Sequence, residues 1–460
     1  MSGPSSNQTT TALVIFGVSG DLAARKLLPA LYWLLAANRL PAGFTVIGVA
    51  RREVTPASLV AVAEQHLGEP ANPAALARLQ SLIRVVRMDS KDPGAYAALQ
   101  AVLAEVERGA AETIRLLYLS IPPAVAMPII TALGKVGLAQ PAGVTTRLLL
   151  EKPFGYDLAS AEQLDRDICS VFTPEQVFRI DHYMAKETAQ NLSVFRFQNP
   201  IIRDVWDNRC VQRIEIEASE QVGIEGRANF YEQTGALRDI IQSHLLNLMA
   251  LTMMERPVDN SVAAFHAERE RLLAAIRPLD LSRLSETAWR GQYDSYRDEV
   301  GNADSLTETF AALRLEIDND RWRGVPVWLS TGKGLAAKRT EIRVMFCEDS
   351  HQKPNWLRLR FAPREGIELE LRAKRPGLHK DTTAIHLRYD YPASLDRQPD
   401  GYEHVIVDAM AGDQTFFTTD VEVLTVWRLL EPLLRVWSQG DDGLVRYRFG
   451  SNGPEVPLWI

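Results

Sequence analysis

Residues 12–23 read ALVIFGVSGDLA, and this stretch decides the fold. A short apolar run is followed by a turn that contains Gly17 and Gly20, and then by a helix-length apolar segment over residues 27–35. Together with Ala23, the glycines have the spacing G-x-x-G-x-x-A, which permits a tight turn and the close approach of a pyrophosphate to a helix N-terminus. The position after the first strand favours a dinucleotide-binding turn, and a structural strand–turn–helix corner is the alternative.

The first part of the chain alternates apolar runs of strand length with helical segments. These runs occupy residues 12–16, 44–50, 83–86, 114–121 and 146–150. Strands that alternate with helices indicate βαβ units and a parallel sheet. We therefore predict a disordered tail over residues 1–11 and an α/β, Rossmann-like dinucleotide-binding domain over residues 12–180.

Beyond residue 180 the pattern changes. Apolar and charged residues alternate with a period of two over residues 214–218, 357–361 and 367–371, which is typical of an antiparallel sheet with one wet face. Residues 235–255 predict one long, mostly apolar helix. We expect a larger α+β domain with a mainly antiparallel sheet over residues 181–460.

Length, charge and cysteine content exclude several classes of protein. The 460 residues suggest two or three domains, and the formal net charge is 51 − 58 = −7, which argues against nucleic acid or an anionic membrane as the main partner. No apolar run approaches the ~18 residues needed to span a bilayer. Cys169, Cys210 and Cys347 fit neither a zinc site nor a disulfide framework, so we expect a reducing cytosol and no metal.

Cationic residues stand where the coenzyme ribose is usually recognised. The second long apolar run ends in Ala50-Arg51-Arg52, at the position where an NAD-selective site usually has an acid. Guanidinium groups suit a 2′-phosphate, so Arg51 and Arg52 favour NADP. Two solvated surface arginines are the alternative.

Two further segments concentrate polar chemistry. Lys152 follows a strand at the edge where open α/β sheets bind ligands, although a Lys-Pro turn is otherwise commonplace. Residues 179–187, RIDHYMAKE, offer several donors to a phosphate dianion, with Asp181 available to orient a base. A charged loop between domains is the alternative.

His244 lies in an apolar helical sequence, where a histidine is more often a satisfied core residue than a catalyst. Imidazole is nevertheless the natural base near neutral pH if a carboxylate orients it. Asp239, five residues earlier, lies roughly 140° around an α-helix at ~100° per residue. We therefore expect the orienting carboxylate to come from elsewhere, for example from Asp181.

Six segments in chain order resemble glucose-6-phosphate dehydrogenase, over nearly the whole chain. They are GVSGDLA with Lys26, IGVARRE, EKPFGYDLASA, RIDHYMAKETAQNL, EGR followed by GALRDIIQSHLL, and GVPVWLSTGKGLAAKRTEI. RIDHY with KE and the helix ending in SHLL are the most specific. The resemblance implies oxidation of D-glucose 6-phosphate at carbon 1 to the 6-phospho-lactone with hydride transfer to NADP, which is the first step of the oxidative pentose phosphate pathway. NAD is a weaker alternative coenzyme.

The resemblance also implies residue roles. His244 matches the general base, and Asp181 matches the carboxylate that orients it. The phosphate binders are His182, Tyr183, Lys186, Lys333 and Lys338, and the residues near the sugar hydroxyls or the anomeric carbon are Lys152, Glu220 and Asp239. The coenzyme site comprises Gly17, Ser19, Gly20, Asp21, Leu22, Lys26, Arg51, Ile121, Pro122, Pro123 and Lys152. One base, one orienting acid and one nicotinamide suffice for this reaction, and no metal is needed.

Some positions depart from the family pattern. Ala185 and Val18 replace smaller residues, the loop after Tyr293 is short, and Asn452 stands where Trp is usual. None of these removes a catalytic or phosphate-binding group. They leave open a paralogue that acts on another sugar phosphate, and a non-catalytic NADP-binding regulator is a third interpretation. A homodimer or a dimer of dimers is implied by the resemblance alone, and a second, structural NADP site is left open.

Overall fold

The computed structural model describes residues 9–68, 70–90, 92–347, 353–378, 380–391 and 397–456. The chain forms two compact units. Unit 1 comprises the chain up to Gly155, Ala159–Ala185 and Pro399–Asp420, and unit 2 comprises Tyr156–Leu158, Lys186–Gln398 and the chain from Val421 onward. Of the tail expected over residues 1–11, the first eight lie outside the described residues. Thr9 already begins the first strand, so residues 9–11 belong to the sheet and not to a tail.

Unit 1 is built around a parallel sheet. Its elements are β1 (Thr9–Phe16), η1 (Ala23–Leu27), α1 (Leu28–Ala36), β2 (Gly43–Ala50), α2 (Pro56–Glu64), α3 (Pro73–Leu82), β3 (Ile83–Arg87), η2 (Pro93–Ala95), α4 (Tyr96–Val106), β4 (Glu112–Leu119), α5 (Pro123–Lys135), β5 (Val144–Leu150), α6 (Leu158–Cys169), η3 (Pro174–Gln176), β6 (Val177–Arg179) and α14 (Gly401–Ala411). The strand order is β3-β2-β1-β4-β5-β6, and every pair is parallel. This order is that of the doubly wound dinucleotide-binding fold, so the predicted α/β class is confirmed.

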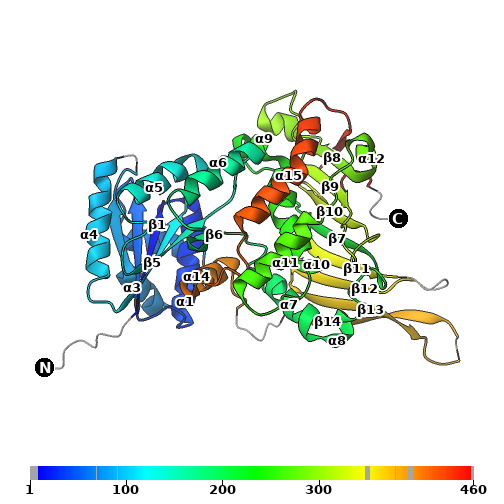
Figure 1. Ribbon diagram of the computed structural model, residues 1–460, viewed down its shortest axis with the longest axis horizontal. Helices are drawn as coiled ribbons and strands as arrows, with labels where there is room; N and C mark the ends of the chain where they lie inside the picture. The colour runs from blue at the N-terminus through cyan, green and yellow to red at the C-terminus, as the bar shows by residue number, and fades with distance from the viewer. Residues whose placement is uncertain are drawn as a thin grey trace. The chain divides into compact units, whose positions relative to one another are not determined.

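Helices cover both faces of this sheet (Figure 1). The buried side chains of α1, α2, α3 and α14 pack on one face, and those of α4, α5 and α6 pack on the other. The strands are therefore apolar on both sides, which explains why their sequence shows continuous apolar runs.

Helix α14 is the part of unit 1 that the expected domain bounds do not contain. It comes from the C-terminal half of the chain, yet Tyr402, Val405 and Ile406 are buried in the same core as α1. The Arg147 side chain from β5 donates hydrogen bonds of 2.6 Å to the carbonyl groups of both Ala409 and Met410. Unit 1 also continues to Ala185, five residues beyond the expected boundary at residue 180.

Unit 2 is built around a nine-stranded sheet. Its elements are α7 (Glu187–Gln198), α8 (Pro200–Arg203), β7 (Val211–Ser219), α9 (Ala228–Ala236), η4 (Leu237–Leu245), α10 (Leu246–Met253), α11 (Val262–Ala274), η5 (Leu281–Arg283), α12 (Leu284–Thr287), β8 (Ala288–Tyr293), α13 (Tyr296–Val300), β9 (Phe310–Leu315), β10 (Val327–Gly332), β11 (Arg339–Phe346), β12 (Trp356–Ala362), β13 (Gly366–Lys374), β14 (Thr382–Asp390), α15 (Asp420–Trp437) and β15 (Leu444–Tyr447). The strand order is β14-β13-β12-β11-β7-β10-β9-β8-β15.

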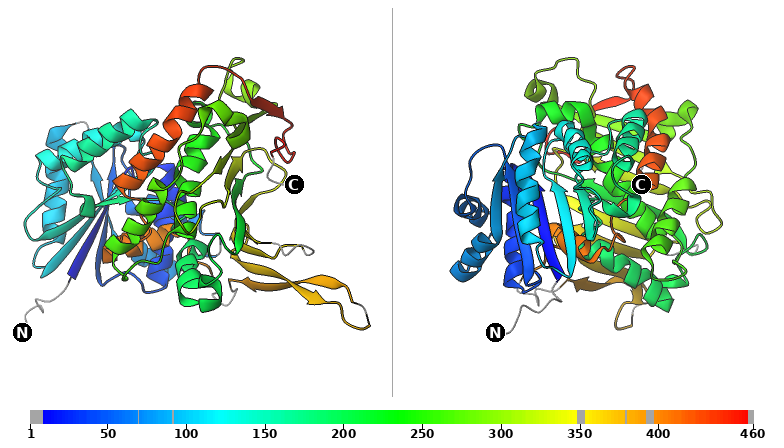
Figure 2. Two further views of the ribbon diagram at one scale, coloured as in Figure 1. Left: turned by 45° about the vertical axis from the view of Figure 1, so that its right-hand side comes forward. Right: turned by 60° about the vertical axis from the view of Figure 1, so that its left-hand side comes forward.

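The neighbours in this sheet are antiparallel except for two parallel pairs, β7 with β10 and β8 with β15. The predicted α+β class with a mainly antiparallel sheet is therefore confirmed. At one edge, β13 and β14 form a long hairpin (Figure 2). Segment η4 packs against β7, β9 and β10, so the residues of η4 are supported by the middle of the sheet.

The single helix expected over residues 235–255 is wrong in its details. The chain instead forms α9, the π-helical segment η4 and then α10. Gly235 separates α9 from η4 with a left-handed backbone (φ 64°), a conformation that interrupts a right-handed helix and that glycine tolerates. Within the described ranges, no helix is sufficiently long and apolar to cross a bilayer.

Candidate active site

A cleft of about 560 Å³ opens at the carboxyl ends of β1 to β4 in unit 1. This is the edge at which open α/β sheets bind nucleotides, and the strand order reverses there between β1 and β4. The residues that line it are Phe16, Gly17, Ser19, Gly20, Val49, Ala50, Arg51, Arg52, Glu53, Val54, Met88, Asp89, Ser90, Ser120, Ile121, Pro122, Val125 and Ile129.

Gly17 and Gly20 are required by the shape of the turn. Gly17 has a φ of 82°, and a Cβ atom there would lie 2.4 Å from the backbone oxygen of Ser120. A Cβ atom on Gly20 would lie 3.0 Å from the oxygen of Gly17, to which the Gly20 N–H donates a hydrogen bond of 2.9 Å. The glycines therefore allow the backbone to pass close to β4 and leave the cleft open above the start of the first helix. This cradle fits a dinucleotide pyrophosphate.

Val18, which departs from the family pattern, is accommodated by a glycine on the neighbouring strand. Val18 is completely buried, and a Cβ atom on Gly48 would lie 2.9 Å from its Cγ1. The valine therefore fills the space above Gly48 and points away from the cleft. The substitution changes core packing and leaves the phosphate cradle intact.

Arg51 and Arg52 lie at the rim of the cleft, directly after β2, and both are exposed. Within the part of the chain that the structure describes, neither guanidinium forms an ion pair. Both are thus available to an anionic ligand. Lys26 differs, because its ammonium group lies 2.9 Å from the Asp400 carboxylate.

Six of the residues expected at the coenzyme site line this cleft: Gly17, Ser19, Gly20, Arg51, Ile121 and Pro122. Asp21, Leu22, Lys26, Pro123 and Lys152 do not line it. Asp21 follows the glycine turn, and its carboxylate forms an ion pair of 2.7 Å with Arg25 in η1. Sequence reasoning missed Asp89 and Ser90, because β3 is short and weakly apolar and its end carries no motif.

A second group of polar residues gathers at the ends of β4, β5 and β6, also in unit 1. The Tyr118 hydroxyl donates a hydrogen bond of 2.5 Å to Glu151, and His182 Nε2 lies within hydrogen-bond distance of the other carboxylate oxygen, at 3.0 Å. Asp181 is 3 % exposed, and its carboxylate accepts a hydrogen bond of 2.9 Å from the Tyr183 N–H. Lys152 follows Glu151 directly. The structure thus brings Asp181 and His182, predicted from the RIDHY segment, to the strand edge that carries Lys152.

Unit 2 gathers another set of the expected residues. Lys333, which is 3 % exposed, pairs with Glu220 and lies 5.4 Å from the centre of the Tyr231 ring. The pKa of the Tyr231 phenol is raised by burial and by the negative charges of Asp239, Glu308 and Glu220. These carboxylates and Lys333 therefore lie close to the Tyr231 side chain. No sequence motif indicated that Tyr231 belongs to this group.

Lys186 and Lys338, the other two lysines expected to bind the phosphate group, lie outside this group. Lys186, at the start of α7, donates a hydrogen bond of 2.8 Å to the carbonyl group of Phe361. Lys338 is exposed in the loop before β11 and makes no described contact.

His244 and Asp239 both lie on η4, and the π-helical geometry corrects the angular argument made from the sequence. In a π-helix the hydrogen bonds run from residue i to i+5, as the Leu246 N–H shows by donating to the Ile241 carbonyl. Residues five apart are therefore about one turn apart and share a face. Asp239 and His244 lie on one side of η4, not roughly 140° apart. His244 is 4 % exposed.

Glu308 supports the start of η4. Its carboxylate accepts a hydrogen bond of 2.9 Å from the Leu237 N–H, and its backbone oxygen accepts one of 2.9 Å from the Ala236 N–H. Burial raises the pKa of Glu308, and the hydrogen bond from Leu237 opposes that shift. A Cβ atom on Gly235 would lie 2.4 Å from the Glu308 carboxylate. Gly235 thus admits the side chain that anchors the segment carrying Asp239 and His244.

Replacing Gly235 with alanine should destabilise unit 2 and displace η4. The new methyl group adds a clash with Glu308 to the strain of a left-handed backbone. Gly301 is the matched control, because it has a similar φ of 68° but open space around its Cβ position. Urea unfolding should show a loss about 1–3 kcal/mol larger for G235A than for G301A. Equal losses for the two variants would contradict the proposed contact.

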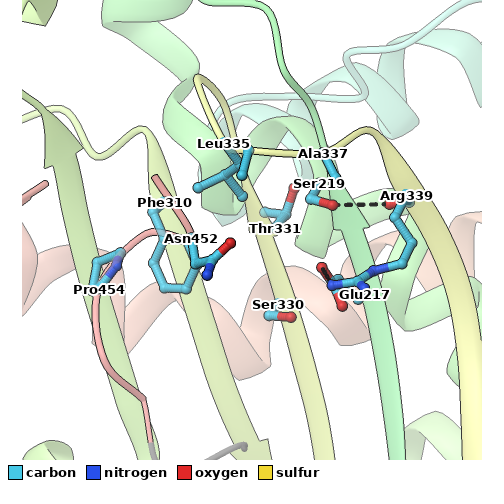
Figure 3. A pocket seen from close by; sticks show the side chains of 11 residues that line it. Glu217, Ser219, Phe310, Ser330, Thr331, Leu335, Ala337, Arg339, Asn452 and Pro454 are labelled. Atoms are coloured by element: carbon cyan, nitrogen blue, oxygen red, sulfur yellow. Dashed lines mark hydrogen bonds and ion pairs between the residues drawn. The ribbon is translucent and has the colours of Figure 1, made fainter. Parts of the chain in front are cut away.

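A further cavity of about 420 Å³ lies in unit 2 and contains none of the expected site residues (Figure 3). Arg339 lines it, but its guanidinium pairs with Glu217 at 2.9 Å, and its carbonyl group accepts a hydrogen bond of 3.3 Å from Ser219. The Arg339 guanidinium in this cavity is therefore paired within the protein.

Comparison with known proteins covers both units. Residues 14–191 match the model described as "Glucose-6-phosphate dehydrogenase, NAD binding domain", and residues 193–457 match "Glucose-6-phosphate dehydrogenase, C-terminal domain". The chain is 37 % identical to glucose-6-phosphate 1-dehydrogenase of Mycolicibacterium smegmatis, with 96 % of this chain and 94 % of the relative covered. The corresponding enzyme of Bacillus subtilis is 34 % identical, with 97 % and 96 % covered.

Solved structures agree with this similarity. A glucose-6-phosphate dehydrogenase in complex with its substrate glucose-6-phosphate superposes with a TM-score of 0.91 at 31 % identity, covering 98 % of this chain and 97 % of the other. Glucose-6-phosphate 1-dehydrogenase from Mycobacterium avium gives a TM-score of 0.82 at 33 % identity, covering 97 % and 96 %. With a nicotinamide-coenzyme domain, a matching C-terminal domain and relatives of this identity along its whole length, the chain belongs to the glucose-6-phosphate dehydrogenase family.

Proposed function

We propose that this protein oxidises D-glucose 6-phosphate to 6-phospho-D-glucono-1,5-lactone with NADP as the coenzyme, the first step of the oxidative pentose phosphate pathway. The observation that carries the proposal is the match of both units to the family, including a substrate complex with a TM-score of 0.91. The candidate base His244, the carboxylate Asp181 and the phosphate-binding lysines expected for the family are all retained.

In this proposal His244 removes the proton of the anomeric hydroxyl group, and Asp181 orients the imidazole and stabilises its charged form. The bound nicotinamide supplies the hydride acceptor for carbon 1. Each of the two side chains is buried, at 4 % and 3 % exposed. Asp239, on the same face of η4 as His244, holds a sugar hydroxyl group near the anomeric carbon, together with Glu220 and Lys152.

The phosphate group of the substrate supplies binding energy at a distance from the reacting carbon. We assign His182, Tyr183, Lys186, Lys333 and Lys338 to this group. A remote dianion held by several donors fixes the position of carbon 1 against the coenzyme, which raises the rate by orientation. Purified protein should therefore reduce NADP with glucose 6-phosphate far faster than with glucose. Comparable kcat/KM for both sugars would contradict the phosphate site.

Coenzyme preference is expected to depend on Arg51, which lines the cleft and has no carboxylate partner among the described residues. Arg51→Ala should raise the KM for NADP by about 10–100-fold, since it removes a charged hydrogen bond to the 2′-phosphate, and should change the KM for NAD little. Arg78, exposed on α3, provides a control arginine away from the cleft. Parallel losses for NADP and NAD in R51A would refute the 2′-phosphate role.

We also propose a homodimer, or a dimer of such dimers, built through the nine-stranded sheet. Its edge strand β14 carries three exposed apolar side chains, Ile385, Leu387 and Tyr389, in alternate positions of one face. An edge strand with an exposed apolar face favours association with another sheet. The three free cysteines support a reducing, cytoplasmic location.

A further inference from the structure

His182 is held by a short chain of hydrogen-bonded side chains in unit 1. Tyr118, on β4, is completely buried, and its hydroxyl group donates a hydrogen bond of 2.5 Å to Glu151. The second oxygen of Glu151 lies 3.0 Å from His182 Nε2. A carboxylate with both oxygens engaged in this way has a fixed orientation, so Tyr118 determines where Glu151 can meet the imidazole.

The charges define which nitrogen of His182 carries a proton. Burial raises the pKa of Glu151, but the attraction of His182 and the hydrogen bonds from His182 and Tyr118 outweigh it, so the pKa lies below its usual value. Glu151 is therefore ionised and can only accept a hydrogen bond. Nε2 must then carry a proton and donate it.

The other ring nitrogen, Nδ1, has a different environment. It is buried, and no hydrogen-bond partner for it is found among the described residues. A buried polar atom without a partner is costly, and it calls for an explanation such as a bound water or ion. A phosphate dianion beside Nδ1 and the Glu151 carboxylate beside Nε2 would together favour the form of the ring with a proton on both nitrogens, in which Nδ1 donates to the anion.

The plane of the imidazole is also fixed. The Tyr402 ring packs against His182 with 4.2 Å between ring centres and a tilt of 30°. Tyr402 lies in the first turn of α14, and its N–H donates a hydrogen bond of 3.0 Å to Asp400, the residue that caps the helix N-terminus. The segment that returns from the C-terminal half of the chain thus restricts rotation of His182.

We propose that Glu151, braced by Tyr118, and Tyr402 are positioning residues that hold His182 with Nε2–H directed into the protein and Nδ1–H presented to the phosphoryl group of the substrate. This inference rests on the proposed function for the identity of the anion. Glu151 and Tyr402 act through His182 and do not touch the reacting carbon.

The kinetic test compares Glu151→Gln and Tyr118→Phe with two matched controls. Glu107→Gln removes a half-buried carboxylate that binds Arg115, and Tyr32→Phe removes a buried hydroxyl that binds the Asn72 N–H, both in unit 1. E151Q should raise the KM for glucose 6-phosphate and the inhibition constant for inorganic phosphate about tenfold or more, with kcat and the KM for NADP changed less than about threefold. Y118F should change the same constants in the same direction by a smaller factor. The proposal would be overturned if E151Q left the KM for glucose 6-phosphate unchanged, as E107Q is expected to do. It would also be overturned if E151Q raised the KM for glucose 6-phosphate and the KM for NADP by the same factor.

A second measurement needs no turnover. Selective ¹⁵N labelling of the eight histidines, with His182 assigned by His182→Asn, should show Nε2 protonated in the wild-type protein and Nδ1 responding to inorganic phosphate. In E151Q the Nε2 signal should shift and the response to phosphate should weaken. An Nε2 without a proton in the wild-type protein would overturn the inference even if glucose 6-phosphate is the substrate. If the protein does not oxidise glucose 6-phosphate but Nδ1 still responds to phosphate, the proposed function fails and the positioning role stands.

Discussion

Replacing His244 with asparagine should lower kcat with glucose 6-phosphate by about 10²–10⁴-fold, the usual contribution of a general base. The asparagine amide has nearly the size of the ring but cannot accept the proton of the anomeric hydroxyl group near neutral pH. The Michaelis constants for both substrates should change little, because the side chain contributes more to the transition state than to the bound ground state.

Initial-rate measurements of coenzyme reduction check this, with His386→Asn as the control. His386 lies on β14 with half of its side chain exposed, so its loss should leave kcat unchanged. Circular dichroism of H244N should match that of the wild-type protein. A kcat within threefold of wild type in H244N would exclude His244 as the base. His244 would then be a buried histidine with a structural role only.

Replacing Gly17 with alanine should abolish measurable coenzyme binding. At a φ of 82° an alanine is strained, and its methyl group would lie 2.4 Å from the backbone oxygen of Ser120 and 2.8 Å from the Ile121 side chain. The turn can relieve this only by moving away from β4, which displaces the backbone that would face the pyrophosphate. We expect the dissociation constant for NADP to rise by at least about 100-fold, equivalent to the loss of close backbone contacts worth about 3 kcal/mol.

Gly137→Ala is a control that introduces backbone strain without a close contact, so it separates the effect of the strain from the effect of the contact between residue 17 and β4. Gly137 has a φ of 73°, and nothing lies within 4 Å of its Cβ position. Both variants should lose stability through backbone strain, but calorimetric titration should show weakened NADP binding in G17A alone. Normal NADP affinity in a folded G17A protein would show that the turn does not hold the coenzyme.

The parallel sheet could be predicted because its signals are local. The run over residues 12–16, the glycine turn and the later apolar runs each indicate their own strand, and a parallel sheet buried on both faces requires such runs. The alternating segments after residue 180 predicted the second sheet for the same reason. The two parallel pairs within that sheet carry no local signal, since they depend on how distant strands meet.

The parts that sequence reasoning missed depend on distant or unusual contacts. Lys26 and Asp400 are 374 positions apart, and no local sequence pattern near either residue indicates that they form an ion pair. The segment that contains Asp400 also places the Tyr402 ring against His182. The π-helical turn around His244 was missed because its apolar periodicity is close to that of an α-helix, and only Gly235 hinted at an interruption.

Glu151 shows how a motif can be seen and its role missed. The segment EKPFG drew attention to Lys152, whereas the structure gives the preceding carboxylate two partners, Tyr118 and His182. Those partners come from β4 and from the loop after β6, which become neighbours only when the strands are ordered β4-β5-β6. Positions of this kind become visible once the sheet order is known.

The most direct test of the proposed reaction follows the hydrogen on carbon 1 of the sugar. Purified protein is supplied with NADP and glucose 6-phosphate that carries deuterium at carbon 1, and both products are analysed by mass spectrometry. We expect the deuterium to appear in the reduced nicotinamide, in one-to-one ratio with the 6-phospho-lactone or its hydrolysis product. Deuterium retained in the sugar, or no reduction of NADP, would contradict it.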